Sequence, residues 1–111
     1  IPTHNRRDAL ELCLAGVQKQ TLTDFSVIVI NDASSDDTEL WLANLRDPKI
    51  LSINLPTNVG VAVARNMAAA QATGDILVFL DDDCVPDSAW LSEILKTFSN
   101  PGSESGVTND R

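Results

Sequence analysis

The sequence predicts an α/β fold with a Rossmann-like, mostly parallel sheet flanked by helices. Two runs of apolar and β-branched residues, 25–30 and 76–80, have the pattern of strands buried on both faces. Segments with the apolar spacing of amphipathic helices stand between the predicted strands, so that strand and helix alternate. This alternation is typical of a parallel sheet with right-handed crossovers and covering helices.

The expected elements begin with a truncated first strand at residues 1–3, which has a Pro-containing end but lacks an apolar body. Helices are expected over about 7–20, 36–46, 59–72 and 88–98, and further strands over 25–30, 50–55 and 76–80. The 50–55 segment alternates apolar and polar residues, which favours a place near the sheet edge. Asp36 and Glu39 have the spacing of a capping box, and Gly74 suits the end of the third helix.

Composition limits the class of protein. With 111 residues the chain is expected to form one domain. Its net charge of −8 argues against a nucleic-acid or anionic-membrane surface, because both require basic patches. Its two cysteines give no disulfide scaffold, and Cys13 on an apolar helix face is expected to be a buried thiol. The sequence shows no signal peptide and no apolar run near the roughly 20 residues of a membrane span, so a cytoplasmic location is expected.

Three consecutive acids, Asp81, Asp82 and Asp83, follow the apolar run 76–80 directly. They would repel one another without a cation among them. Because side chains alternate along a strand, Asp81 and Asp83 should point to one side and Asp82 to the other. Two carboxylates on one side suit a hard divalent cation. The plain alternative is that these acids are solvated or cap the following helix.

Three loops should meet at one edge of the sheet, because parallel strands end at the same side. These loops are residues 3–6, 32–36 and 81–86, and ligands of such sheets bind beyond the carboxyl ends of the strands. This convergence predicts a shared site. Asp32 could instead bond only its own turn, and Arg65 could be solvated or reach a phosphate or an acid.

Several classes of enzyme are disfavoured by missing motifs. The chain has neither a Gly-rich dinucleotide loop nor a Walker loop, and it has no Cys/His cluster for structural zinc. Residues 81–85 fit the D-x-D-x-(T/V) motif of haloacid-dehalogenase phosphotransferases, but they follow the fourth predicted strand and no later lysine completes the motif. A response-regulator receiver also has acids at strand ends and a nearby proline, but the spacing of the proline in this chain and the missing lysine disfavour that class. His4, Arg6 and Arg7 are expected to be solvated.

Four segments in order resemble the nucleotide-binding half of inverting family 2 glycosyltransferases with the GT-A fold. Residues 1–6 (I-P-T-H-N-R) resemble the opening I-P-T-Y-N-R, and residues 29–38 resemble V-V-D-D-G-S-x-D-x-T. Residues 58–66 resemble N-x-G-x-x-x-A-R-N, and residues 73–83 resemble T-G-(D/E) followed by the D-x-D motif. Asn31 and Ala33 depart from the usual Asp and Gly. The resemblance covers residues 1 to about 98.

The resemblance implies a nucleotide-sugar donor, UDP- or dTDP-linked, with Mg²⁺ or Mn²⁺ on its diphosphate. The donor-binding residues that it implies are Pro2, Thr3, Asn5, Asp32, Arg65, Asp81 and Asp82, and the metal ligands are Asp83 and Asp81. Asp32 would bond the uracil ring, and Arg65 would lie near the base or the diphosphate. Asp81 would face the ribose, Asp83 the metal, and Asp82 the sugar.

The general base of inverting transfer is expected outside these residues, because Glu93 and Glu104 are poorly placed to serve. Residues 1–98 are therefore expected to form a partial donor-binding domain, and 99–111 an irregular tail or the start of a missing acceptor half. Without that half the fragment is expected to have no turnover. The parent could also be a non-catalytic GT-A-like nucleotide-binding or interaction module. The sugar, the acceptor and the oligomeric state are not predicted, and a membrane association of the parent would depend on segments outside the chain.

Overall fold

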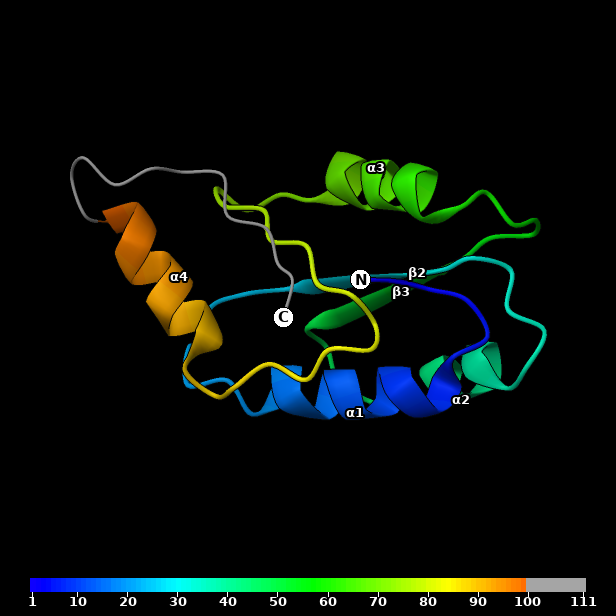
Figure 1. Cartoon of the computed structure of the whole chain (residues 1–111), viewed down its shortest axis with the longest axis horizontal. Helices are drawn as coiled ribbons and strands as arrows, with labels where there is room; N and C mark the ends of the chain where they lie inside the picture. The colour runs from blue at the N-terminus through cyan, green and yellow to red at the C-terminus, as the bar shows by residue number, and fades with distance from the viewer. Residues whose placement is uncertain (100–111) are drawn as a thin grey trace.

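A computed structural model describes residues 1–99 and shows a parallel sheet with helices on both faces (Figure 1). The strands are β1 (Pro2–Thr3), β2 (Val27–Asn31) and β3 (Ile50–Asn54), and the helices are α1 (Arg7–Gln18), α2 (Thr38–Asn44), α3 (Val61–Gln71) and α4 (Trp90–Ser99). The strand order is β1-β2-β3, and both pairings are parallel. The predicted α/β class is confirmed, and so is the place of 50–54 at a sheet edge.

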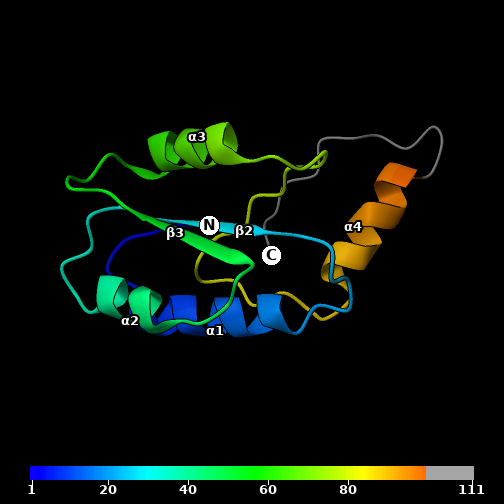
Figure 2. The ribbon, with the colours of Figure 1, turned by 180° about the vertical axis from the view of Figure 1, so that it is seen from behind.

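Strand β2 is the centre of the fold because its side chains alternate between two apolar layers. Val29 packs in a core with Leu10 and Leu14 of α1, whereas Ile30 packs with Ala64 and Ala68 of α3. Both views of the ribbon accordingly show α1 and α2 on one face of the sheet and α3 on the other (Figures 1 and 2). The small alanine side chains allow α3 to lie close to β2.

Helix α1 buries the apolar face that the sequence predicted. It also packs against the segment that follows the three acids. Gly16 lies against Pro86: a Cβ at Gly16 would be 2.9 Å from Pro86 Cδ and 3.0 Å from its carbonyl oxygen. Just beyond the helix, the buried Gln20 donates to the Asp87 carbonyl at 2.6 Å and accepts from the Leu91 amide at 2.9 Å. These contacts fix residues 86–91 against α1.

The prediction of a buried strand over 76–80 is wrong. These residues form no strand, and although Leu80 is buried, Leu77 is 42% exposed. A strand needs a neighbour with free backbone groups, and β1 has only two residues, of which Pro2 has no N–H. The edge of the sheet beside β1 therefore offers no ladder along which five residues could pair.

The helix ends also differ from the prediction. Helix α2 begins at Thr38, where Asp36 accepts hydrogen bonds from the Thr38 amide and hydroxyl in place of the predicted capping box. Helix α3 ends in an extended residue, Ala72, and Gly74 does not adopt the left-handed conformation of a helix-ending glycine. Helix α4 continues to Ser99. The rest of the predicted tail lies outside the described residues, and the boundary at 98 stays a prediction. None of the helices within residues 1–99 has the length and apolar character that a bilayer crossing requires.

Candidate functional site

The loops that follow β1 and β2 and the acidic segment 81–83 meet at the carboxyl edge of the sheet, as predicted. The Asp32 amide donates to the Thr3 carbonyl at 2.8 Å, which extends the pairing of β1 and β2. The Thr3 hydroxyl donates to Asp82 Oδ2 at 2.8 Å, although 79 positions separate the two residues. Thr3 thus joins both loops at one place.

Two arginines supply the positive charge that the three consecutive acids require. Arg65 of α3 lies 2.6 Å from Asp81 Oδ1, and Arg6 lies 3.2 Å from Asp82 Oδ1 and 3.6 Å from Asp83 Oδ2. The Arg65 guanidinium also lies 5.9 Å from the centre of the Phe79 ring, within reach of a cation–π contact. Of the alternatives left open for Arg65, the structure shows the contact with an acid, whereas the prediction that Arg6 is merely solvated is wrong.

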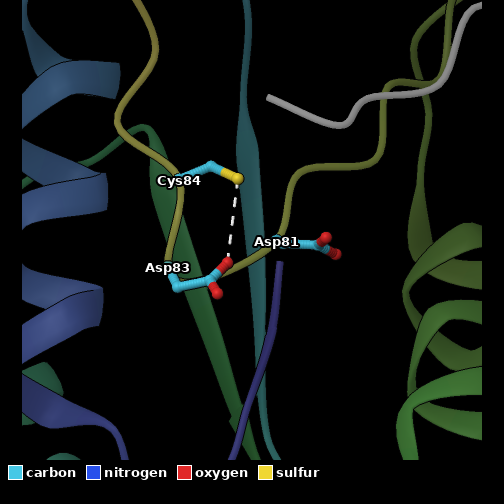
Figure 3. A group of neighbouring side chains, drawn as sticks. All are labelled: Asp81, Asp83 and Cys84. Carbon is cyan, nitrogen blue, oxygen red and sulfur yellow. Dashed lines mark hydrogen bonds between the residues drawn. The ribbon is translucent and has the colours of Figure 1, made fainter.

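The three carboxylates divide between two environments. Asp82 is buried, 6% exposed, and is bonded to Thr3 and Arg6. Asp81 and Asp83 lie with Cys84, and one potential ligand atom from each of the three falls within 4.8 Å of the others (Figure 3). Carboxylate oxygens at such separations suit a divalent cation, so the residues present fit the metal that the sequence predicted.

Asp32 directly follows β2, and its side chain, which is 4% exposed, contacts the residues just before α3. Its Oδ1 accepts from the Val59 amide at 2.8 Å, and its Oδ2 accepts from the Gly60 amide at 2.9 Å. Gly60 has φ 90° and ψ 162°, a conformation that is essentially restricted to glycine. Asp32 therefore bonds a distant turn instead of its own, and each carboxylate oxygen keeps a further lone pair for a ligand.

His4 and Asn58 surround the backbone carbonyl of Asp32. His4 Nδ1 lies 2.7 Å from this oxygen, and the Asn58 amide nitrogen lies 3.3 Å from it. A carbonyl only accepts, so Nδ1 is the donor of this hydrogen bond, and His4 Nε2 lies 3.3 Å from the Asn5 amide nitrogen. The expectation that His4 is merely solvated is therefore wrong. The strand-end position of the 3–6 loop was the available signal.

Asn5 organises the loop after β2. Its Oδ1 accepts from the Ser35 amide at 2.6 Å and from the Asp36 amide at 3.3 Å, and its own φ is 53°. Ala33 in the same loop has φ 57°, the left-handed conformation that glycine adopts without strain. Ala33 thus keeps the backbone shape expected of the usual Gly, at a cost in conformational energy.

Asn31, the second departure from the usual motif, has a partner on the neighbouring strand. It pairs in register with Asn54, and its amide donates to Asn54 Oδ1 at 2.8 Å. Its own Oδ1 accepts from the Ser34 amide at 3.3 Å. An amide side chain at position 31 therefore supports both the sheet and the loop.

Cys13 lies beneath the acidic segment. It is fully buried, and burial raises the pKa of its thiol to about 12, which keeps it protonated. Its Sγ lies 3.7 Å from the Asp81 carbonyl oxygen, a distance suited to a weak S–H···O bond. Cys13 is therefore a packing residue that contacts the backbone of the site.

Comparison with known proteins gives one consistent family. The family model described as "Glycosyl transferase family 2" matches residues 1–108. A β-1,3-glucosyltransferase of Campylobacter jejuni, named for GalNAc(5)-diNAcBac-PP-undecaprenol, is 35% identical over 99 residues, which are 86% of this chain and 32% of the relative. Glycosyltransferase AglE of Haloferax volcanii is 32% identical over 107 residues, which are 92% of this chain and 35% of the relative. The chain thus spans about one third of the length of the curated relatives it matches.

Solved structures agree with this grouping. The mannosyltransferase PcManGT from Pyrobaculum calidifontis, in complex with GDP-Man and Mn²⁺, superposes with a TM-score of 0.79 at 28% identity. The match covers 90% of this chain and 31% of that one. TarS 1–349 of S. aureus, in complex with UDP-GlcNAc, superposes with a TM-score of 0.82 at 27% identity, over 88% of this chain and 29% of that one. These neighbours are GT-A glycosyltransferases, so the predicted resemblance is confirmed.

Proposed function

The chain belongs to glycosyl transferase family 2, and we propose that it forms the donor-binding region of an inverting hexosyltransferase. The donor is a nucleotide sugar, UDP-linked, that binds at the carboxyl edge of the sheet together with Mg²⁺ or Mn²⁺. The GDP-Man, UDP-GlcNAc and UDP complexes of the structural neighbours support a nucleotide sugar as the class of donor.

The observation that carries the proposal is the pairing of Asp81, Asp82 and Asp83 with two arginines. Arg65 and Arg6 form ion pairs with the three acids, and their side chains are 38% and 55% exposed. A metal taken up by the acids would have these guanidinium groups next to it. Such groups bind phosphate oxygens well because their donors are planar and permanently charged.

The metal would be held by Asp83 and Asp81, and when bound it would stabilise the negative charge of the departing diphosphate. Arg65, on α3, is close enough to Asp81 to interact with the same diphosphate or with the base. Asp81 itself would face the ribose. These assignments follow from the family motif, and the ligand-atom distances within the cluster are compatible with them.

The nucleoside is assigned to the other half of the site. Asp32 would bond the uracil ring through its remaining lone pairs, with the Pro2 and Thr3 backbone beside the nucleoside. Asn5 would contribute by holding the adjoining loop. Asp82, which the motif places nearer the sugar, is bonded to Thr3 and Arg6, and we assign it to the support of that side of the site.

The general base belongs, in this proposal, to a part of the protein beyond these 111 residues, so the isolated chain is expected to bind donor without transferring sugar. A location in the cytoplasm or at the cytoplasmic face of a membrane is also part of the proposal. Nucleotide binding by the whole protein with no transfer to any acceptor would favour the non-catalytic alternative.

Calorimetry on the whole protein tests the proposal with UDP and UDP-sugars, each with and without Mn²⁺. We expect metal-dependent binding that Asp83→Ala abolishes and that Asp24→Ala leaves unchanged. Asp24 is the matched control because it is exposed and precedes β2, at the opposite end of that strand. Failure of the folded whole protein to bind any of these nucleotides would refute the proposed function.

A further inference from the structure

We propose that the thiol of Cys84 is a third protein ligand of the metal, so that the site accepts thiophilic divalent cations in addition to Mg²⁺ and Mn²⁺. The inference rests on the proposed function in one respect, which is that Asp81 and Asp83 hold a metal. It goes beyond that function because the two aspartates alone form an all-oxygen set.

The distances suit a shared cation. Cys84 Sγ lies 3.7 Å from Asp83 Oδ1, and a carboxylate oxygen of Asp81, one of Asp83 and the Cys84 sulfur all lie within 4.8 Å of one another (Figure 3). Two ligands bound at about 2.3 Å (sulfur) and about 2.1 Å (oxygen), at a tetrahedral angle, are about 3.6 Å apart. The sulfur and the Asp83 oxygen are therefore already separated as ligands of one ion would be.

Arg6 pairs with the other oxygen of the Asp83 carboxylate. Its guanidinium lies 3.6 Å from Asp83 Oδ2, whereas Oδ1 of the same carboxylate is the oxygen nearest the sulfur. Arg6 can thus stay paired while Oδ1 and Sγ bind a cation. The Asp83 side chain is 59% exposed, so an ion can enter from solvent.

A backbone turn brings the Cys84 thiol to the Asp83 carboxylate, while the Asp81 carboxylate beside them points toward α3 (Figure 3). The Cys84 amide donates to the Asp81 carbonyl at 3.1 Å, which closes a turn over residues 81–84. Asp82, inside the turn, is held by the Thr3 hydroxyl at 2.8 Å, and the chain that follows is seated on Gly16 of α1 through Pro86. The turn is therefore anchored on both sides, and little reorganisation is needed before a metal binds.

The chemical consequence is a change in metal preference. Mg²⁺ prefers oxygen ligands, whereas thiolate favours softer cations such as Zn²⁺ and Cd²⁺. On binding, the Cys84 S–H bond is replaced by a metal–sulfur bond, and the proton passes to the buffer. No oxidant or other reactant is required.

Titration with Cd²⁺ alone, followed by the ultraviolet thiolate-to-cadmium charge-transfer absorption, tests this proposal on the whole protein. We expect the band in the native protein, its loss in Cys84→Ser, and its retention in Cys13→Ala. The apparent affinity for Cd²⁺ should fall about tenfold or more in Cys84→Ser, while the affinity for Mn²⁺ changes much less. Circular dichroism checks that each variant is folded.

The outcomes separate this proposal from the proposed function. A band that persists in Cys84→Ser, or that never forms in a protein with normal Mn²⁺-dependent UDP binding, would overturn the role of Cys84 alone. A Cys84-dependent band in a protein that binds no nucleotide would support the thiol ligand and refute donor binding. Loss of the band in Asp83→Ala would confirm that the thiol and the carboxylate bind the same ion.

Discussion

The hydrogen bond from Thr3 to Asp82 makes the sharpest test of how the site is built. Thr3 is 3% exposed and Asp82 is 6% exposed, and the donor–acceptor distance is 2.8 Å. Thr3→Val keeps the shape of the side chain and leaves one oxygen of a buried carboxylate without this partner. A hydrogen bond to a charged group contributes about 1.5–3 kcal/mol, so the free energy of unfolding should fall by that amount.

The second partner of Asp82 should matter less. Arg6 is 55% exposed, and an ion pair with that much solvent access contributes about 0–1 kcal/mol. Arg6→Gln is therefore expected to cost less than Thr3→Val, although it removes a full charge. The combination of Thr3→Val with Asp82→Leu should cost less than Thr3→Val alone, because the unsatisfied carboxylate is then gone.

Urea unfolding followed by tryptophan fluorescence measures these differences, since Trp41 and Trp90 both pack against the main core. Thr23→Val is the matched control, because Thr23 is exposed on the loop before β2. A Thr3→Val protein within about 0.5 kcal/mol of this control would show that the bond does not support the site. Equal losses for Thr3→Val and the double variant would show that the buried carboxylate is not the cause.

Three further predictions concern the surrounding loops and a thiol. Ala33→Gly should raise the free energy of unfolding by about 0.5–1 kcal/mol. Ala33 has φ 57°, and the strain that glycine relieves there exceeds the entropy that glycine adds to the unfolded chain. Urea unfolding measures the difference, and a loss of stability would contradict the prediction. Hydrogen bonds from Thr38 lower the pKa of Asp36 below its ordinary 3.8, so this carboxylate stabilises the fold above that pH and the stability is lost as the pH falls through the lowered pKa. Asp36→Asn should therefore be less stable than the native chain at pH 7, and the difference should shrink when the unfolding series is repeated in acid. The Cys13 thiol should react with a disulfide reagent only after unfolding, because it is fully buried, as mass spectrometry of labelled peptides would show.

Local patterns predicted the fold class and the place of the site. The apolar spacing of Leu10, Cys13, Leu14 and Val17 marks the buried face of α1, because a helix repeats every 3.6 residues whatever its neighbours are. The β-branched run before Asn31 marks β2 for a similar reason. Once strands and helices alternate, the handedness of the crossovers brings the strand ends to one edge, and the sequence alone thus indicated that Thr3, Asp32 and Asp81–Asp83 would meet.

The tertiary structure decided which groups pair at that edge. Solvation was a plausible fate for Arg6 and Arg65 in the sequence, yet each lies against an acid, at positions 82 and 81, because the loop after β1 and helix α3 bring them to the acidic segment. The run 76–80 has the composition of a strand, but pairing depends on the backbone of a neighbouring segment, and β1 offers too little of it. Hydrophobic periodicity is encoded locally and can be predicted from the chain itself. Hydrogen bonds and ion pairs between residues up to 79 positions apart depend on packing that only the folded structure shows.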